Sequence, residues 1–412
     1  MTVAGIEMEP GIWQRRMLMA GSALALSVYY ITYATGFDET EAGSSNVLTQ
    51  LGRLMAVVLM VLALRPIRLR IDSALALTSL LSLALWSLLV AWATTGHTND
   101  TFFINTILQL PVLLALNGTR LHVDYARWLR FIVWLVALQA IIDAIIVMRG
   151  SALWISEAFV GGVGNPSSFG LICVLACAFC LLHPQAGRGR RPVAGWLAIA
   201  AIMTKSLFAF FGLAIIAAIW ASRSWRRLVT SLILACAASM TLYYCAVGLV
   251  DKDDPAFLEH KVLAAGALLG FGSYDVESSG SVSARLEIHQ LTYNALRDEP
   301  WRLLVGHLQG QVYWPLDSQM LAYLGSFGIA MLLGFLSIHL LWTHRAWTNA
   351  RNDGGFSFVA LLLFSLIFLT NRILDYFPVA SMYFLCVMSA RRAHYQADEL
   401  AFDPAISRSS AG

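Results

Sequence analysis

The chain has 412 residues, of which 58% are hydrophobic and only 13% charged, and its formal net charge is +3. Soluble domains carry about 25% charged residues, so this composition excludes an ordinary soluble enzyme, and no nucleic acid is expected as a partner. Apolar stretches long enough to cross a bilayer recur from end to end, with Ala74–Trp92 and Leu228–Val250 the clearest. The composition predicts an all-α polytopic membrane protein, with residues 1–412 forming one integral domain.

The first apolar stretch follows Arg15 and Arg16 and resembles a signal peptide. It reaches Tyr33 without a convincing small-residue cleavage site, so an uncleaved first helix is expected. Hydropathy then predicts about twelve transmembrane helices, at Met17–Tyr33, Val47–Leu64, Ala74–Trp92, Phe102–Leu116, Leu129–Met148, Phe169–Leu182, Val193–Met203, Leu207–Trp220, Leu228–Val250, Ser318–Leu341, Phe356–Thr370 and Val379–Met388.

The connections between these helices alternate in charge. Arginine clusters mark every second connection, for example Arg65 to Arg70 and Arg188 to Arg191, and the others are acidic, polar or mixed. The positive-inside rule then places both termini in the cytoplasm and the protein in a bacterial inner membrane. On this topology Asp251–Leu316 is one large periplasmic loop, late in the chain, between the ninth and tenth helices.

For one segment, only the charge pattern decides how many spans it contains. Val193–Trp220 is long for one span and short for two, yet arginine clusters flank it on both sides. A hairpin that turns on the outer side near Thr204-Lys205-Ser206 resolves the conflict. Irregular backbone at membrane depth is tolerated only where it lines a protein cavity, so Lys205 is a candidate site residue.

The long loop has a pattern of its own. Ala284–Arg297 is predicted to form an amphipathic helix that Pro300 stops, with Arg285 and His289 on one face. Gly306-His307 follows, and the chain re-enters the membrane through a segment that contains Asp317.

A buried acid and the cysteines complete the candidate residues. Asp143 lies within the predicted span Leu129–Met148, with Gln139 one turn earlier on the same face. An intramembrane carboxylate must be paired or neutral, and both a structural and a catalytic role are open for it. All six cysteines lie in apolar stretches, where packing is the expected role. No disulfide and no metal are expected.

Topology and three short stretches together resemble the O-antigen polymerase and O-antigen ligase superfamily (Wzy-type polymerases). The stretches are Gly161–Phe169, with its Asn-Pro step; the Thr204-Lys205-Ser206 turn; and Ser283-Ala284-Arg285 followed by Pro300, Gly306–Gly310 and Asp317-Ser318. The motifs are degenerate and short, but their order and their side of the membrane match. Asp317-Ser318 stands where ligases show His-Asn, and Leu207 where an Arg often follows the serine; both departures favour a polymerase.

The resemblance implies a GT-C-like membrane glycosyltransferase architecture and transfer of a glycan from undecaprenyl diphosphate to a sugar hydroxyl at the periplasmic face. The protein must then neutralise charge on the leaving diphosphate and assist deprotonation of the acceptor. A cofactor is not required, and membrane lipids, a chain-length regulator and a flippase of the same pathway are implied partners. The residues assigned to catalysis are Asp317, Arg285, Glu287, His289 and His307, and those assigned to substrate binding are Lys205, Arg372 and Asn165.

Each residue also has a structural interpretation. Asp317 fits a helix N-cap, Arg285 a solvated loop helix, and Lys205 an amine extended to the interface. Asn165-Pro166 fits an N-cap followed by a first-turn proline. The two histidines fit structural roles better than catalytic ones.

Three other functions are open. An O-antigen ligase would pass the glycan to a lipid or other acceptor. A glycosyltransferase that uses a polyprenyl-monophosphate sugar would place acidic residues in the first outer loop, where Asp38-Glu39-Thr40-Glu41 lies. A transporter of lipid-linked sugars would show repeated halves with interrupted helices, and no such repeat is evident.

Overall fold

The computed structural model describes residues 10–34, 47–67, 123–151, 157–187, 189–222, 297–306, 318–348, 352–374 and 379–389, with isolated residues at 111–119, 153, 287–294 and 350. This part of the chain is mostly helical and contains no strand; its β-structure is limited to one bridge between Ile67 and Thr119. The predicted helices Ala74–Trp92 and Leu228–Val250, and most of Phe102–Leu116, lie outside the described residues.

The described helices fall on the predicted spans, except for the four-residue helix at Arg302–Val305, which lies in the predicted long loop. They are α1 (Ile12–Ala34), α2 (Val47–Ala63), α5 (Tyr125–Met148), α6 (Pro166–Leu182), α7 (Arg190–Met203), α8 (Leu207–Ala221), α12 (Arg302–Val305), α13 (Gln319–Thr348), α14 (Phe356–Thr370) and a final helix, Val379–Ser389. Two short 3-10 turns, η1 (Gly161–Val163) and η2 (Pro184–Ala186), flank α6. The boundaries differ mainly at α1, which begins five residues before Met17, and at α13, which continues past Leu341.

Two of these helices, Tyr125–Met148 and the Phe327–Thr348 part of α13, are long and apolar enough to cross a membrane. The two parts of α13 meet at Gly328, whose φ of 79° breaks the helix there. Shorter apolar helices make up much of the rest, including α6, α8 and α14.

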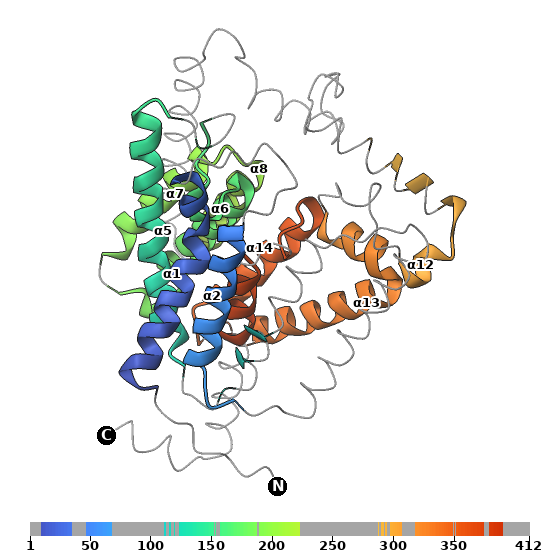
Figure 1. The fold of residues 1–412 in the computed structure, drawn as a ribbon, viewed down its shortest axis with the longest axis horizontal. Helices are drawn as coiled ribbons and strands as arrows, with labels where there is room; N and C mark the ends of the chain where they lie inside the picture. Colours follow the sequence, from blue (N-terminus) through green and yellow to red (C-terminus); the bar gives the residue numbers. More distant parts are fainter. Residues whose placement is uncertain are drawn as a thin grey trace.

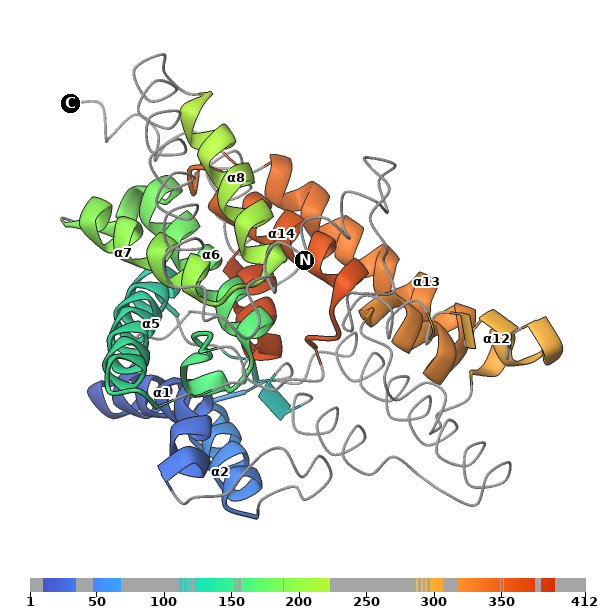
Figure 2. The same ribbon diagram turned by 90° about the horizontal axis from the view of Figure 1, so that it is seen from above.

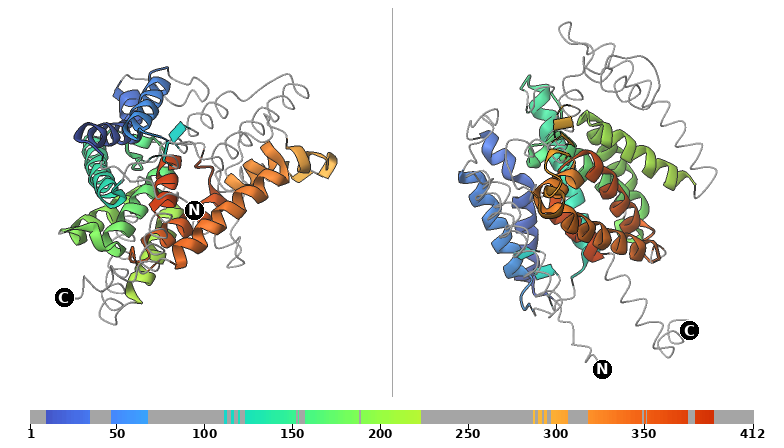
Figure 3. Two further views of the ribbon diagram at one scale, coloured as in Figure 1. Left: turned by 90° about the horizontal axis from the view of Figure 1, so that it is seen from below. Right: turned by 90° about the vertical axis from the view of Figure 1, so that its right-hand side faces the viewer.

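Helix α6 is the centre of the packing. Its buried residues occupy nearly the whole circumference, including Cys173, Cys177 and Cys180. The Cys177 thiol donates to the Ala194 carbonyl of α7 at 3.6 Å, so this cysteine lies in a helix–helix contact. On another side of α6, Phe179 packs edge-on against Phe356 of α14, with ring centroids 5.3 Å apart. Figures 2 and 3 show α14 between α6 and α13, and α13 with α12 projecting away from α1, α2 and α5.

The predicted hairpin is confirmed. Helix α7 ends at Met203 and α8 begins at Leu207, so Thr204-Lys205-Ser206 is the turn between them. Lys205 has a φ of 51°, in the left-handed region that few residues other than glycine adopt.

Four arginines of the described part lie at one end of the helices, here called the arginine end (Arg15, Arg65, Arg127 and Arg190). The Gln14 amide, at the start of α1, donates to the Arg65 carbonyl after α2 at 2.6 Å. The Arg190 guanidinium donates to the His183 carbonyl at 3.3 Å, and His183 shares a cavity with Arg15 and Arg127. Figure 1 shows α1 and α2 side by side, running away from this end. Residues from four of the predicted arginine clusters therefore lie at one end of the described bundle.

Candidate functional site

A glycine-rich turn that precedes α6 is held by one buried carboxylate. Asp143 of α5 is fully buried, and its Oδ2 accepts the backbone N–H groups of Val160 at 2.9 Å and Gly161 at 2.7 Å. Its Oδ1 accepts the Tyr30 hydroxyl of α1 at 2.6 Å. The question left open for Asp143 thus has a structural answer: the residue joins α1, α5 and the turn.

The turn itself depends on close backbone approach. Gly161 and Gly164 have φ values of 57° and 73°, which other residues adopt only with strain. A Cβ on Gly162 would lie 2.1 Å from the Leu26 carbonyl oxygen of α1, so no larger residue fits there. Gln139, one turn before Asp143, donates its amide to the same carbonyl at 2.8 Å.

Asn165 follows directly as the N-cap of α6. Its side-chain oxygen accepts the Ser168 N–H at 3.0 Å, and Pro166 occupies the first turn. The structural interpretation of the Asn-Pro step is therefore confirmed. The cap holds the start of α6 in place. The substrate-binding role of Asn165 stays a prediction.

Two stretches that are distant in the sequence meet at this place. The Phe159 N–H donates to the Met203 carbonyl at 3.0 Å, where α7 ends. A Cβ on Gly170 would lie 2.9 Å from the Thr204 Oγ1, so α6 abuts the hairpin turn with no space between them. The residues on either side of the Gly161–Asn165 turn therefore contact the hairpin around Thr204–Ser206.

A third stretch ends at the same level. A Cβ on Gly212 of α8 would lie 2.9 Å from Val174 of α6 and 3.4 Å from Leu363 of α14, so the three helices meet there. Lys205, Asn165 and Arg372 each lie seven to nine residues from that contact, always toward the end opposite the arginine end. At about 1.5 Å per helical residue, the three lie at similar heights, roughly 10–14 Å beyond the contact.

The start of α13 is tied to the chain beside Arg372. The Leu374 N–H donates to the Gln319 Oε1 at 2.8 Å, and the Ser318 hydroxyl donates to the Phe368 carbonyl at 3.2 Å. Gln319 is fully buried, and its Nε2 has no hydrogen-bond partner. Sequence reasoning missed Gln319; its position two residues after Asp317, at the point of re-entry, was the available signal.

The loop candidates are only partly described. Glu287 is helical and exposed, as the predicted loop helix requires. Described residues of that helix extend to Asp298, before Pro300, which confirms the predicted stop. Arg285, His289, His307 and Asp317 lie outside the described residues, so their assignment stays a prediction. Within the described residues, no group of three His, Cys, Asp or Glu side chains is placed to hold a metal ion.

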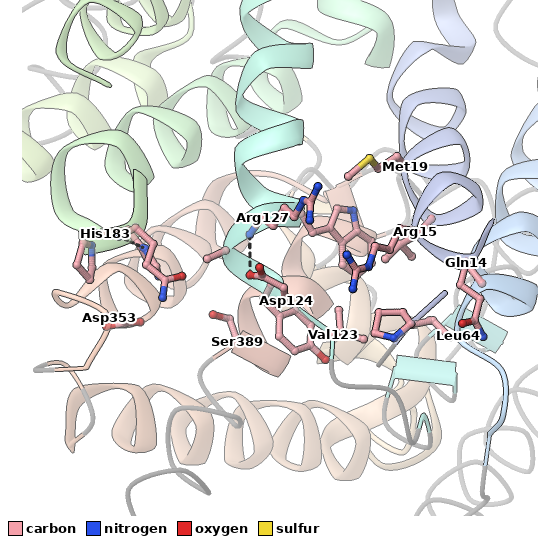
Figure 4. A pocket seen from close by; sticks show the side chains of 18 of the residues that line it. Gln14, Arg15, Met19, Leu64, Val123, Asp124, Arg127, His183, Asp353 and Ser389 are labelled. Atoms are coloured by element: carbon pink, nitrogen blue, oxygen red, sulfur yellow. Dashed lines mark hydrogen bonds between the residues drawn. The ribbon is translucent and has the colours of Figure 1, made fainter. Parts of the chain in front are cut away.

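A separate polar cavity of about 480 Å³ opens at the arginine end (Figure 4). Its lining comes from six segments and includes Arg15, Arg127, His183, Asp124 and Asp353. None of the described residues assigned to catalysis or substrate binding (Glu287, Asn165, Lys205 and Arg372) lines it. Burial lowers the pKa of His183 below its usual 6.5, although Asp353 acts in the opposite direction.

No protein-family model matches this sequence, and a search of characterised proteins finds no relative.

Proposed function

We propose that the protein is a polytopic inner-membrane glycosyltransferase that polymerises polyprenyl-diphosphate-linked oligosaccharide repeats into a surface polysaccharide at the periplasmic face. The cytoplasmic position of both termini and of the arginine end belongs to this proposal. The proposal also includes that the shorter apolar helices, and the predicted spans outside the described residues, cross the membrane.

The observation that supports the proposal is the similar distance of Asn165, Lys205 and Arg372 along their helices from the contact at Gly212, always away from the arginine end. Two of the three residues, Lys205 and Arg372, are cationic. These two lie more than a hundred positions apart in the sequence. Lys205 lies in a turn between two short apolar helices, where a charge is costly unless it faces a cavity or an anion. A diphosphate on a lipid carrier supplies such an anion at that depth.

The chemistry required of these residues is limited. The acceptor hydroxyl oxygen attacks the anomeric carbon of the donor sugar, while the bond from that carbon to the diphosphate oxygen breaks. The diphosphate leaves with the bonding electrons, and cations stabilise it; a planar guanidinium such as that of Arg285 or Arg372 can bind two of its oxygens. Asp317 is the proposed acceptor of the hydroxyl proton, with Glu287, His289 and His307 as the other candidates.

Deletion of the gene, followed by sizing of surface glycan, tests the proposal. Single repeats in place of long chains, restored to long chains by the intact gene, are the expected result. Long chains that are made but not attached to their lipid acceptor would identify a ligase instead, and repeats trapped on the cytoplasmic side would identify a transporter.

Complementation with Arg285 variants then tests the site. Arg285→Ala should lose about 10²–10³ in rate, the usual effect of removing one preorganised donor, and Arg285→Lys should also be impaired because it loses the guanidinium fork. Polymer of normal amount and length from Arg285→Ala, at normal protein level, would remove Arg285 from the site.

Activity that requires added Mg²⁺ or Mn²⁺ after EDTA treatment would contradict the metal-independent chemistry.

A further inference from the structure

The cavity at the arginine end has no part in the proposed glycan transfer, because Asn165, Lys205 and Arg372 lie at the other end of the bundle. It is nevertheless a defined space. Its walls come from the start of α1, the end of α2, the start of α5, the η2 turn, the connection before α14 and Ser389 at the end of the final helix. A volume of about 480 Å³ is within the range of small-molecule sites.

Two arginines supply its hydrogen-bond donors. Figure 4 shows Arg15 and Arg127 reaching from α1 and α5 toward the same part of the cavity, with His183 and Asp353 farther along the wall. The Arg127 side chain is exposed, and its guanidinium forms no ion pair with any described residue. Guanidinium groups offer paired N–H donors that match the oxygens of a phosphate.

The two carboxylates of the lining are already engaged. Asp353 accepts the Gly355 N–H through Oδ1 and the Ser357 N–H through Oδ2, each at 2.9 Å. Asp124 caps α5 by accepting the Arg127 N–H at 2.9 Å. Helix N-termini of this kind offset the negative charge of a capping carboxylate. Both acids therefore already accept backbone N–H groups, which leaves the exposed Arg127 guanidinium able to attract an anion.

The surroundings of the cavity favour a lipid as the source of that anion. Trp13 and Ile12, beside Arg15, are 74% and 70% exposed. The Arg16 guanidinium lies 5.8 Å from the Trp13 ring, and Arg345 lies over the Trp342 ring at 4.8 Å. An exposed tryptophan beside an arginine, as at Trp13, is typical of the membrane–water interface, and basic pockets between helices on the cytoplasmic side bind anionic head groups.

We infer that this cavity binds a phosphate-bearing ligand, the phosphodiester head group of an anionic phospholipid, through the guanidinium groups of Arg15 and Arg127. The inference rests on the membrane orientation of the proposed function but not on glycan transfer, since it concerns binding at the opposite end of the molecule.

The test uses the full-length protein, purified in detergent and stripped of lipid. Wild type and variants are reconstituted in nanodiscs that contain either phosphatidylcholine alone or phosphatidylcholine with phosphatidylglycerol, and retained phosphatidylglycerol is measured by native mass spectrometry after release. Affinity should fall roughly fivefold for Arg15→Gln or Arg127→Gln and about 25-fold for the double variant. Arg345→Gln is the matched control, because Arg345 lies at the same end but does not line the cavity.

Three results are informative. Selective loss of phosphatidylglycerol from the double variant, with Arg345→Gln unchanged, supports the inference. Saturable stabilisation by inorganic phosphate that requires Arg15 and Arg127, without lipid retention, supports the phosphate site but replaces the lipid by a soluble ligand. Equal effects of Arg345→Gln, or no binding of either probe to wild type, overturn the inference. If the double variant does not fold, Arg127→Lys, which keeps the charge and loses the fork, should still weaken binding.

Discussion

Lys205 has a left-handed backbone conformation and is proposed to bind the diphosphate through its amine. A substitution can separate the effect of the backbone from the effect of the charge. Lys205→Gly preserves the left-handed turn and removes the amine, so any loss of activity reports the charge. We expect a fall of about 10²–10³ in polymerisation rate with unchanged protein level. Lys205→Arg should retain most activity. The measurement is polymer formed from purified lipid-linked repeats, and a fully active Lys205→Gly would assign the residue to the turn alone.

Asp143 acts on the candidate site through the glycine-rich turn. Asp143→Ala leaves the Val160 and Gly161 N–H groups without an acceptor, at a cost of about 1–3 kcal/mol each. We expect polymer formation per molecule to fall along with stability.

Ser22→Ala is the matched control for Asp143, because the Trp128 indole donates to the Ser22 hydroxyl at 2.8 Å, between the same two helices but away from the turn. It should lower the melting temperature without changing the rate per folded molecule. If Asp143→Ala and Ser22→Ala lower the polymerisation rate equally, Asp143 contributes only to general packing.

His183 makes stability depend on pH. Its Nδ1 accepts the Gln185 N–H at 3.1 Å, and its ring stacks on Phe179 with centroids 4.7 Å apart. Burial lowers its pKa below the usual 6.5; Asp353 and Asp124 oppose this and Arg130 adds to it. The unfolded chain therefore binds the proton more readily, and stability should decrease as the pH falls below about 6.5. Melting curves from pH 8 to 5 should show this decrease, and His183→Asn, which keeps a capping oxygen, should flatten it.

At the scale of helices, the contact between α6 and the hairpin turn is sensitive to a single substitution. A Cβ on Gly170 would lie 2.9 Å from Thr204 Oγ1 and 3.2 Å from Ala209 Cβ. Gly170→Val should displace the turn and abolish most polymer formation, at a stability cost of about 1–3 kcal/mol from overpacking. Gly195→Val on α7 is the control, since a Cβ there meets nothing within 4 Å. Equal activity of the two variants would contradict the role of this contact.

The sequence predicted helices better than it predicted their partners. Hydropathy located the described helices other than α12. The charge pattern alone required the break at Thr204–Ser206, because a single span would have placed one arginine cluster on the wrong side. The Asp143–Tyr30 bond joins residues that are 113 positions apart, and the Gln319–Leu374 bond spans 55. Periodicity reports which face of a helix is buried but not what covers it, so neither bond was predictable.

For the whole molecule, the sidedness of the membrane is the central prediction. Single reporter cysteines at Ser279, in the long loop, and at Gln185, in the η2 turn, test it in a background without the six native cysteines. The Ser279→Cys reporter should react with an impermeant maleimide in intact cells, and Gln185→Cys only after permeabilisation. The reverse pattern would place the arginine end outside and remove the basis for periplasmic chemistry.

The hairpin of α7 and α8 also sets a depth. With 14 and 15 residues, its helices rise about 21–22 Å, well short of the roughly 30 Å of bilayer hydrocarbon. On the proposed topology, a hairpin that enters from the arginine side would end below the opposite head groups, and the outer leaflet would have to thin above Lys205. Lipids with shorter acyl chains would relieve this hydrophobic mismatch. Turnover should therefore vary with bilayer thickness, even though every residue of the site is unchanged.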